Sequence, residues 1–400
     1  MKLLEKIILG LVFLASVIFQ IHNISLYNPD FGFDGQDHQA YISWITANHK
    51  LPLPGMGWEY TQSPLYYLIG AFFQTISINP QFINLLAFMV IGWVIYKYSK
   101  SFIATLAFFG LPMMNYLVPQ ISNEYLSGMW IVITFFIILK IPKIKDSVLL
   151  IKQILLASFV IALGFYTKYT SLTLFPILLL AIVLNQHFSI TQKIKNSLVA
   201  GVFIFILISP ITFRNTELYG KPFILAEDIQ NIWDKNKTRD LPFFIRLDWI
   251  PKVDIFSARE YSFTGGLWNT FWHDGNHSAS PVVSFHKKAF GLWALGFPLS
   301  IMSLWGLFQI FKKKKTEAIL LFSYLVVALA SLVKYSLLAP HSNSFKAFYA
   351  MGIIVPYALG LSAFSKTGKW QYRLNAFLLL VQFATMVSYF WIQPWWHLVK

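Results

Sequence analysis

Four side chains that can exchange protons lie close together near the start of the chain. Asp34 lies three residues before Asp37 and four before His38, and Asp37 lies four before Tyr41, spacings that place side chains on one face of a helix. A carboxylate near a hydrocarbon boundary loses water, which raises its proton affinity and suits general-base chemistry. The pattern predicts a helix that begins near Asp34 and carries one proton-accepting face. In the alternative interpretation, Asp34 only caps a surface helix.

Three more charged residues stand at the ends of apolar runs. Glu124 precedes such a run, so it is either a site residue or a favourable charge at a helix N-terminus. Lys168, with Tyr169 beside it, is a candidate phosphate ligand or a side chain that only extends to water. The guanidinium of Arg214 suits an anionic lipid phosphate, with anchoring at the membrane surface as the alternative.

The composition indicates which kind of element positions these residues. Hydrophobic residues make up 56% of the 400-residue chain and charged residues 12%, whereas a soluble domain carries roughly 25% charged residues. We therefore predict an all-α polytopic membrane protein and exclude a soluble multidomain enzyme and a disordered scaffold. The chain has no cysteine, which excludes disulfides, thiolate catalysis and cysteine-bound metals.

About eleven apolar runs have the length of roughly 20 residues that a transmembrane helix needs. They are residues 7–26, 81–98, 101–119, 121–139, 150–167, 169–186, 194–213, 288–311, 316–336, 346–364 and 373–393. The first run lacks a small-x-small cleavage site, so we expect a retained helix rather than a cleaved signal peptide.

The run 64–78 is short for a span, and the charges favour an interfacial or re-entrant helix instead. With that assignment the inner segments collect 17 basic and three acidic residues, a net charge of +14, and the outer segments have +1. Because lysine and arginine collect on the cytoplasmic side, the N-terminus is predicted inside and the C-terminus outside. The net charge of +15 is then explained by the membrane topology, and we expect no nucleic-acid partner.

Three parts follow from this topology. Residues 1–213 form an N-terminal transmembrane module with a first outer loop at 27–80, residues 214–287 form a mixed outer segment, and residues 288–400 form the C-terminal helices. Within the outer segment, His273, Asp274 and His277 are possible zinc or manganese ligands, but Gly275 and Asn276 indicate a loop. We prefer a substrate-facing or structural role for them.

The first outer loop contains, in order, the segments Asp34-xxx-His38-xx-Tyr41, Leu51-Pro52, Gly57-Trp58-Glu59 and Gln62-Ser63-Pro64-Leu65-Tyr66-Tyr67. With these segments it resembles the first outer loop of the GT-C glycosyltransferases, in the bacterial branch related to protein O-mannosyltransferases and the lipid A aminoarabinose transferase. The family often has Pro-Pro where this chain has Ser63-Pro64, and Asp-Glu where it has Asp34 and Asp37. The counterpart of the family's essential aspartate therefore stays open between these two, and the spacing to His38 favours Asp34.

The resemblance continues in order to about residue 225 and weakens beyond it. Glu124 stands where the family has a second acid, usually Asp. Lys168 in LGFYTKYTSLTLFP and Arg214 in SPITFRNTELYGKPF match segments at the outer ends of family helices. Lys346 in KAFYAMGIIVP stands where Arg is commoner.

The resemblance implies an enzyme of the bacterial inner membrane that moves a sugar from a polyprenyl-phosphate donor to a glycan, lipid or protein acceptor on the periplasmic face, with inversion. Asp34 or Asp37 would be the base, and Glu124 would orient the acceptor. Some relatives use a divalent cation (Mg, Mn or Zn) and others none. The donor phosphate would meet Lys168, Arg214 and Lys346, and the substrate would meet His38, Tyr41, Glu59, Tyr66 and Tyr169.

A transporter or flippase of a lipid-linked glycan is the alternative, because intramembrane charges and a large outer loop suit it as well. Against it, no inverted repeat is visible and the acids cluster on outer loops rather than at the bilayer midplane. The absence of Walker and dinucleotide glycine motifs also argues against an energy-coupled pump. A third reading, an inactive structural subunit, stays open.

Overall fold

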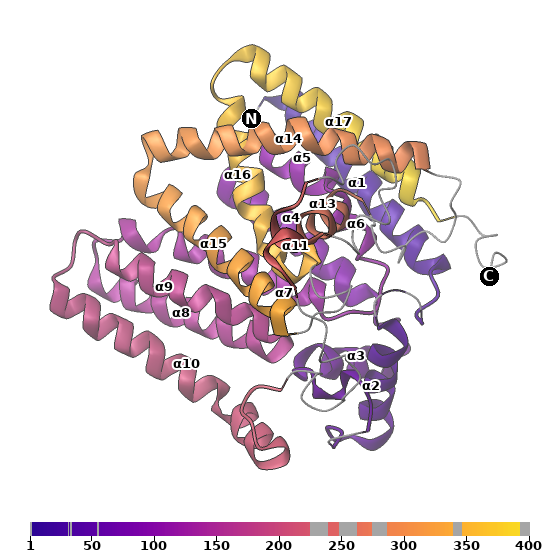
Figure 1. Ribbon diagram of the computed structural model, residues 1–400, viewed down its shortest axis with the longest axis vertical. Helices are drawn as coiled ribbons and strands as arrows, with labels where there is room; N and C mark the ends of the chain where they lie inside the picture. Colours follow the sequence, from indigo (N-terminus) through magenta and orange to yellow (C-terminus); the bar gives the residue numbers. More distant parts are fainter. Residues whose placement is uncertain are drawn as a thin grey trace.

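The computed structural model is built from helices (Figure 1). It describes residues 2–30, 32, 34–53, 56–224, 239–247, 262–273, 286–338 and 346–392. Among these residues, nine helices are long and apolar enough to cross a membrane, which confirms a polytopic membrane protein. They are Leu3–Leu26, Phe82–Ser99, Glu124–Lys143, Ser147–Thr167, Ile190–Tyr219, Lys288–Lys313, Lys315–Leu338, Ala347–Ser365 and Lys369–Phe390.

The predicted count of eleven is not confirmed, because two apolar runs form shorter elements. Residues 101–119 form α5 (Phe102–Gly110) and α6 (Pro112–Tyr116). Leu111 between them is extended, as expected of a residue that precedes proline. Residues 169–186 form the 3-10 turn η3 (Tyr169–Thr173) and α9 (Leu174–Val183). Nine residues of α-helix rise only about 14 Å, roughly half of the hydrocarbon thickness.

The run 64–78 forms the short helix α3 (Leu65–Thr75), which agrees with an interfacial or re-entrant segment. It packs against α2 (Gly35–Asn48), and the two helices lie together at one end of the molecule (Figure 1). The 3-10 turn η1 (Glu59–Thr61) precedes α3. The first outer loop therefore folds as a small helical unit on the membrane bundle.

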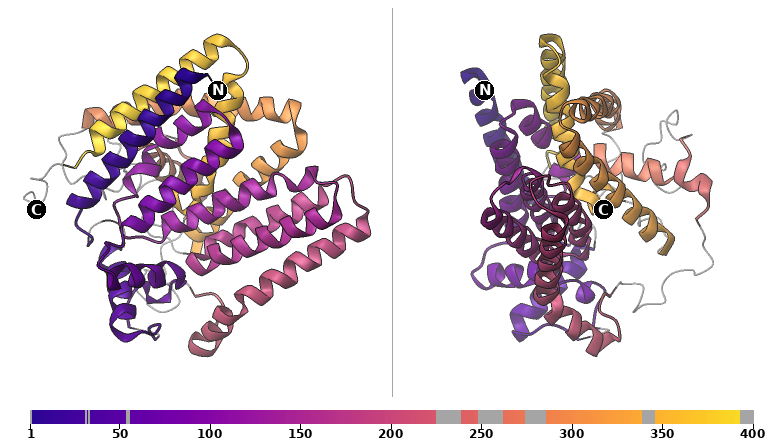
Figure 2. Two further views of the ribbon diagram at one scale, coloured as in Figure 1. Left: turned by 180° about the vertical axis from the view of Figure 1, so that it is seen from behind. Right: turned by 90° about the vertical axis from the view of Figure 1, so that its left-hand side faces the viewer.

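The centre of the bundle is the stretch 102–129, in which every residue is buried. Helix α5 is surrounded by α1 (Leu3–Leu26) and α4 (Phe82–Ser99) from the N-terminal part and by α16 (Ile354–Ser365) and α17 (Lys369–Phe390) from the C-terminal part. Segments far apart in the sequence thus share one core (Figure 2).

A second group of helices carries the chain away from that core. Helices α7 (Glu124–Ile138), α8 (Ser147–Thr167), α9 and α10 (Ile190–Tyr219) run side by side, with α10 outermost (Figures 1 and 2). The 3-10 turn η2 (Ile141–Lys143) joins α7 to α8. The chain reverses direction at each of these connections, so Lys168 and Arg214 lie near the same end of the group.

The C-terminal part adds four helices and the buried parts of the outer segment. Helix α14 (His286–Lys313) crosses α16 closely, and α15 (Lys315–Leu338) lies between α14 and the turn η6 (Ala347–Ile353). Within the mixed segment 214–287, helices α11 (Leu241–Ile245) and α13 (Phe263–Trp272) are described. Helix α13 packs on α6, α14 and η6.

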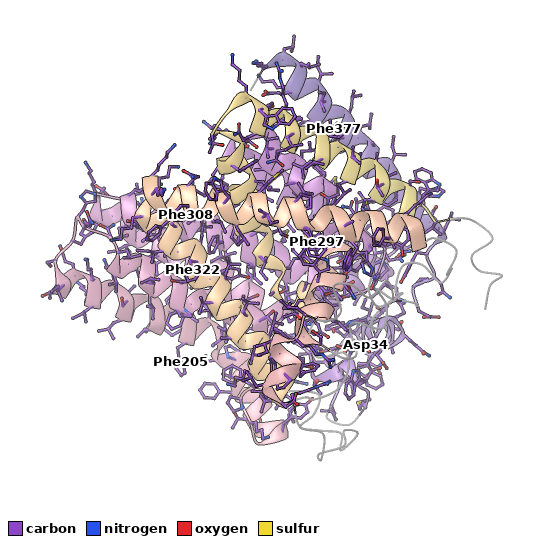
Figure 3. All side chains as sticks on the ribbon, turned by 45° about the horizontal axis from the view of Figure 1, so that its top comes forward. Asp34, Phe205, Phe297, Phe308, Phe322 and Phe377 are labelled. Carbon is purple, nitrogen blue, oxygen red and sulfur yellow. The ribbon has the colours of Figure 1, made fainter. Side chains whose placement is uncertain are left out.

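Aromatic side chains project from the outside of the bundle, as Figure 3 shows for several labelled phenylalanines. Phe205, Phe322 and Phe377 each expose more than 60% of their surface. An apolar exterior of this kind suits a lipid environment rather than water, where large exposed apolar patches are rare.

Candidate functional site

Asp34 stands at the start of α2 with an exposed side chain (Figure 3). Its backbone is left-handed, with φ 54°, and its side chain makes no cap hydrogen bond to the helix. Gly35 follows under the backbone of Pro29 and Asp30, where a Cβ would come within 2.9 Å of the Pro29 carbonyl oxygen. This close approach fixes the beginning of α2, and the Asp34 carboxylate is not used for capping, contrary to the alternative interpretation.

One helical turn later, His38 enters a buried hydrogen-bonded network. Its Nδ1 lies 2.8 Å from the Tyr67 hydroxyl and 3.6 Å from Glu59 Oε2. The Tyr67 hydroxyl also donates to Glu59 Oε2 at 3.4 Å. Helix α2, turn η1 and helix α3 each contribute one member, so this network holds the first outer loop together.

Burial sets the charges of this network. It lowers the pKa of His38 to about 3, with a further contribution from the Lys168 ammonium. It raises the pKa of Glu59 to about 8, assisted mainly by the negative charge of Asp34. Near neutral pH the imidazole is therefore uncharged and the Glu59 carboxyl mostly protonated, so their 3.6 Å approach is not an ion pair.

Asp37 remains half-buried in the first turn of α2. Burial raises the pKa of its carboxyl, and the neighbouring charge of Asp34 raises it further. Asp34 and Asp37 thus form a coupled pair of carboxylates at the surface of the loop. A raised proton affinity is the property that general-base chemistry requires.

Two predicted substrate-binding residues lie inside the loop rather than on its surface. Tyr41 is stacked on Tyr67 with ring centres 3.9 Å apart and is 2% exposed. Tyr66 is fully buried, and its hydroxyl accepts a hydrogen bond from the Ser122 backbone N–H at 3.0 Å. Their burial favours a supporting role for both, and a direct contact with substrate stays a prediction.

Glu124 and Lys168 form a buried ion pair between adjacent helices. Glu124 is the first residue of α7, and Lys168 immediately follows the last residue of α8. The Lys168 ammonium also lies 4.9 Å from the centre of the Tyr349 ring. The partly buried Lys168 ammonium thus contacts both a carboxylate and an aromatic surface.

Lys346 brings a second cation to the same place. It is buried, and its ammonium lies 5.6 Å from the centre of the Tyr349 ring. The charges of Lys346 and Asp34 both act on the Glu124 carboxylate. The first outer loop, the α7–α8 pair and the segment before η6 therefore meet, although the sequence separates them by more than 300 residues.

Arg214 and Tyr169 make other contacts. The Arg214 guanidinium donates to the Pro52 carbonyl oxygen at 2.6 Å, and the Tyr169 hydroxyl accepts from the Asn215 side chain at 2.9 Å. These bonds tie the end of α10 to the first outer loop and to η3. A role for Arg214 in binding phosphate stays a prediction.

The structure adds three residues that the motifs did not single out as site residues. Tyr67 bridges His38 and Glu59, and Tyr349 faces both lysines. Asn123 donates to the Tyr67 hydroxyl at 3.5 Å and to the Thr167 carbonyl oxygen at 3.4 Å. The only signal in the sequence was that Asn123 and Tyr67 flank residues already chosen.

The described residues contain no group of three or more histidine, aspartate or glutamate side chains arranged to hold a metal ion. His273 is buried at the end of α13, whereas Asp274 and His277 lie outside the described residues.

The charges of Asp34, Lys168 and Lys346 all act on the Glu124 carboxylate, and the charge of Asp34 also acts on Asp37. Carboxylates and ammonium groups within this range of one another can combine a proton acceptor with an anion receptor. All belong to the end of the bundle where the first outer loop packs, and the surrounding helices are apolar. A search of protein-family models found no match to the chain, and a search of curated proteins found none either.

Proposed function

We propose that the chain is a membrane glycosyltransferase that transfers a sugar from a polyprenyl-phosphate donor to a hydroxyl acceptor on the extracytoplasmic face, with inversion. The observation that carries the proposal is that the charges of Asp34, Lys168 and Lys346 act on one carboxylate, Glu124, at one end of the bundle, while Asp34 also acts on Asp37. Such a site provides a proton acceptor and an anion receptor beside an apolar exterior that a lipid-linked donor can approach.

The base acts on the acceptor. An acceptor hydroxyl has a high pKa, so a carboxylate must take its proton as the oxygen attacks the anomeric carbon. Asp34 is the more exposed of the two acids, whereas burial and Asp34 itself raise the pKa of Asp37. Both residues are therefore candidates for the base, and attack opposite to the leaving group inverts the anomeric centre.

The two lysines act on the leaving group. As the glycosidic bond breaks, negative charge develops on the lipid phosphate, and nearby ammonium groups stabilise it. Lys168 and Lys346 supply these ammonium groups, and both of them contact the Tyr349 ring. In this scheme Glu124 holds Lys168 in place through their ion pair.

Transfer by the purified protein in lipid nanodiscs tests this function. A panel of polyprenyl-phosphate sugars and, for comparison, nucleotide sugars is offered with a cell extract as acceptor. We expect turnover of one lipid-linked donor and a loss of about 100-fold or more in Asp34→Asn or Asp37→Asn. Asp30→Asn, which changes an exposed aspartate of the same loop, should retain activity.

Two outcomes would contradict the proposal. Full activity in both Asp34→Asn and Asp37→Asn would remove the base assignment. Movement of an intact lipid-linked glycan across the bilayer, without transfer of its sugar, would instead identify a flippase.

A further inference from the structure

An apolar groove lies between α9 and α10, away from the candidate site. It encloses about 700 Å³, within the range of small-molecule pockets. Lys193 is the one charged side chain among its lining residues. The apolar wall includes Phe175, Leu179 and Val183 of α9 and Ile194, Leu198 and Phe205 of α10.

The groove begins at the end of α10 that is opposite to the site. Lys193 lies in the first turn of the helix, whereas Asn215, near its last turn, contacts Tyr169 at the site end. From Lys193 to Phe205 the helix rises about 18 Å, slightly more than half of a hydrocarbon core of roughly 30 Å. The groove therefore has the length of one membrane leaflet.

Gly201 lines the groove, and the space beside it could hold a larger side chain. A Cβ on Gly201 would meet only the tip of the Phe175 ring, at 3.7 Å. At the other end, Phe205 precedes Arg214 by nine residues, a rise of about 14 Å. The groove thus stops well short of the residues assigned to the donor phosphate, and its own cation, Lys193, lies at the end farthest from them.

We propose that this groove binds an acyl chain of an anionic phospholipid, whose phosphate contacts the Lys193 ammonium in the leaflet opposite the candidate site. Lys193 is half-buried and lines the groove, so its aliphatic stem can lie along the apolar wall while its charge reaches the membrane surface. A single cation at the head end and an apolar wall one leaflet long match a phosphate joined to an acyl chain. The proposal does not depend on the proposed sugar transfer.

Native mass spectrometry of the detergent-solubilised protein tests the assignment with dipalmitoyl phosphatidylglycerol and phosphatidylcholine as probes. We expect one phosphatidylglycerol to be retained in preference to phosphatidylcholine. Lys193→Gln should weaken its binding about fivefold, and Gly201→Leu should remove it by filling the groove. Lys195→Gln is the matched control, because Lys195 is exposed on the same helix and does not line the groove.

Each contrary result overturns the proposal. Equal losses in Lys193→Gln and Lys195→Gln would show that general surface charge attracts the lipid. Equal retention of phosphatidylcholine would remove the role of the anionic phosphate. Unchanged binding in a Gly201→Leu protein with wild-type thermal stability would place the lipid elsewhere, and displacement by equimolar polyprenyl phosphate would reassign the groove to the donor.

Discussion

Glu59 and His38 contact the same tyrosine, yet their protonation affects stability in opposite directions. Because the folded pKa of Glu59 is about 8 against an ordinary 4.5, its protonated form stabilises the fold fully at low pH, and this stabilisation is lost as pH rises to 8. The folded pKa of His38 is about 3 against 6.5. The stabilisation that comes from the neutral form of His38 is present above pH 6.5 and is lost as pH falls. Between pH 6.5 and 8, therefore, only the protonation of Glu59 changes the stability of the fold.

We predict that Glu59→Gln flattens the stability profile in that window. The wild type should lose up to about 1.4 kcal/mol per pH unit relative to the variant, the value for one proton. Thermal unfolding in detergent at several pH values measures the difference, with Glu217→Gln as a control at an exposed glutamate. Parallel profiles for Glu59→Gln and the wild type would mean that Glu59 does not take up a proton on folding.

The Glu124–Lys168 pair leads to a second prediction at the residue scale. Lys168→Met leaves Glu124 buried without its partner, which costs about 3–5 kcal/mol. Lys143→Met is the matched control, since the Lys143 side chain is 65% exposed in its pair with Glu317 and should cost less than about 1 kcal/mol. Thermal unfolding should also show that Glu124→Met restores part of the stability lost in Lys168→Met. Equal costs for the two lysine variants would contradict the prediction.

The individual residues of this site are easier to identify from the sequence than the residues with which they pair. Glu124 and Lys168 are conspicuous because each is a charge beside apolar residues, but their pairing depends on two helices packing across 44 residues. Likewise His38 and Glu59 belong to recognisable motifs, whereas burial by tertiary contacts determines that one is neutral and the other protonated. Tyr349 lies in an apolar run and has no local pattern that distinguishes it from other aromatic residues.

At the scale of the elements, helices α14 and α16 approach each other closely where each of them has a glycine. A Cβ on Gly306 would lie 1.7 Å from the Gly360 carbonyl oxygen, and a Cβ on Gly360 would lie 2.4 Å from the Ser303 carbonyl oxygen. Backbone cannot move aside as a flexible side chain can. Small residues at such crossings allow membrane helices to pack closely.

We predict that Gly306→Ala separates these helices and destabilises the protein by about 1–3 kcal/mol. Gly291→Ala is the control on the same helix, because its nearest neighbour would be a methyl group at 3.9 Å. The control should be neutral or slightly stabilising, since alanine favours a helix over glycine. Thermal unfolding of both variants in one detergent makes the comparison, and a Gly306→Ala protein as stable as the control would contradict it.

Element boundaries show where hydropathy fails as a guide. Residues 101–119 form one apolar run, but the first helix ends at Gly110, two residues before Pro112, and a second helix begins at that proline. The proline is visible in the sequence, whereas equal apolarity on both sides hides the break from a window average. The same averaging hides the 3-10 turn at Tyr169–Thr173. For the run 64–78 the prediction of a short helix rather than a span used the distribution of charges as well as hydropathy, and the structure has a helix at Leu65–Thr75.

At the scale of the whole molecule, the two ends of the bundle should face opposite sides of the membrane. The absence of native cysteine makes single-cysteine labelling unambiguous. In spheroplasts of a bacterial host, an impermeant maleimide should label Lys50→Cys in the first outer loop. Lys145→Cys, near the α7–α8 connection, should react only after permeabilisation. Labelling of both from the same side would contradict the predicted topology.

The buried position of α5 has a consequence for the order in which the chain is made. Helix α5 is too short to cross a bilayer, and its neighbours α16 and α17 are synthesised some 250 residues later. Until those two helices are synthesised, the apolar surface of α5 is covered only in part, by α1 and α4. The packing around α5 is therefore complete only after the last helices have been synthesised. A chain that stops before residue 354 lacks α16 and α17, two of the four helices that surround α5.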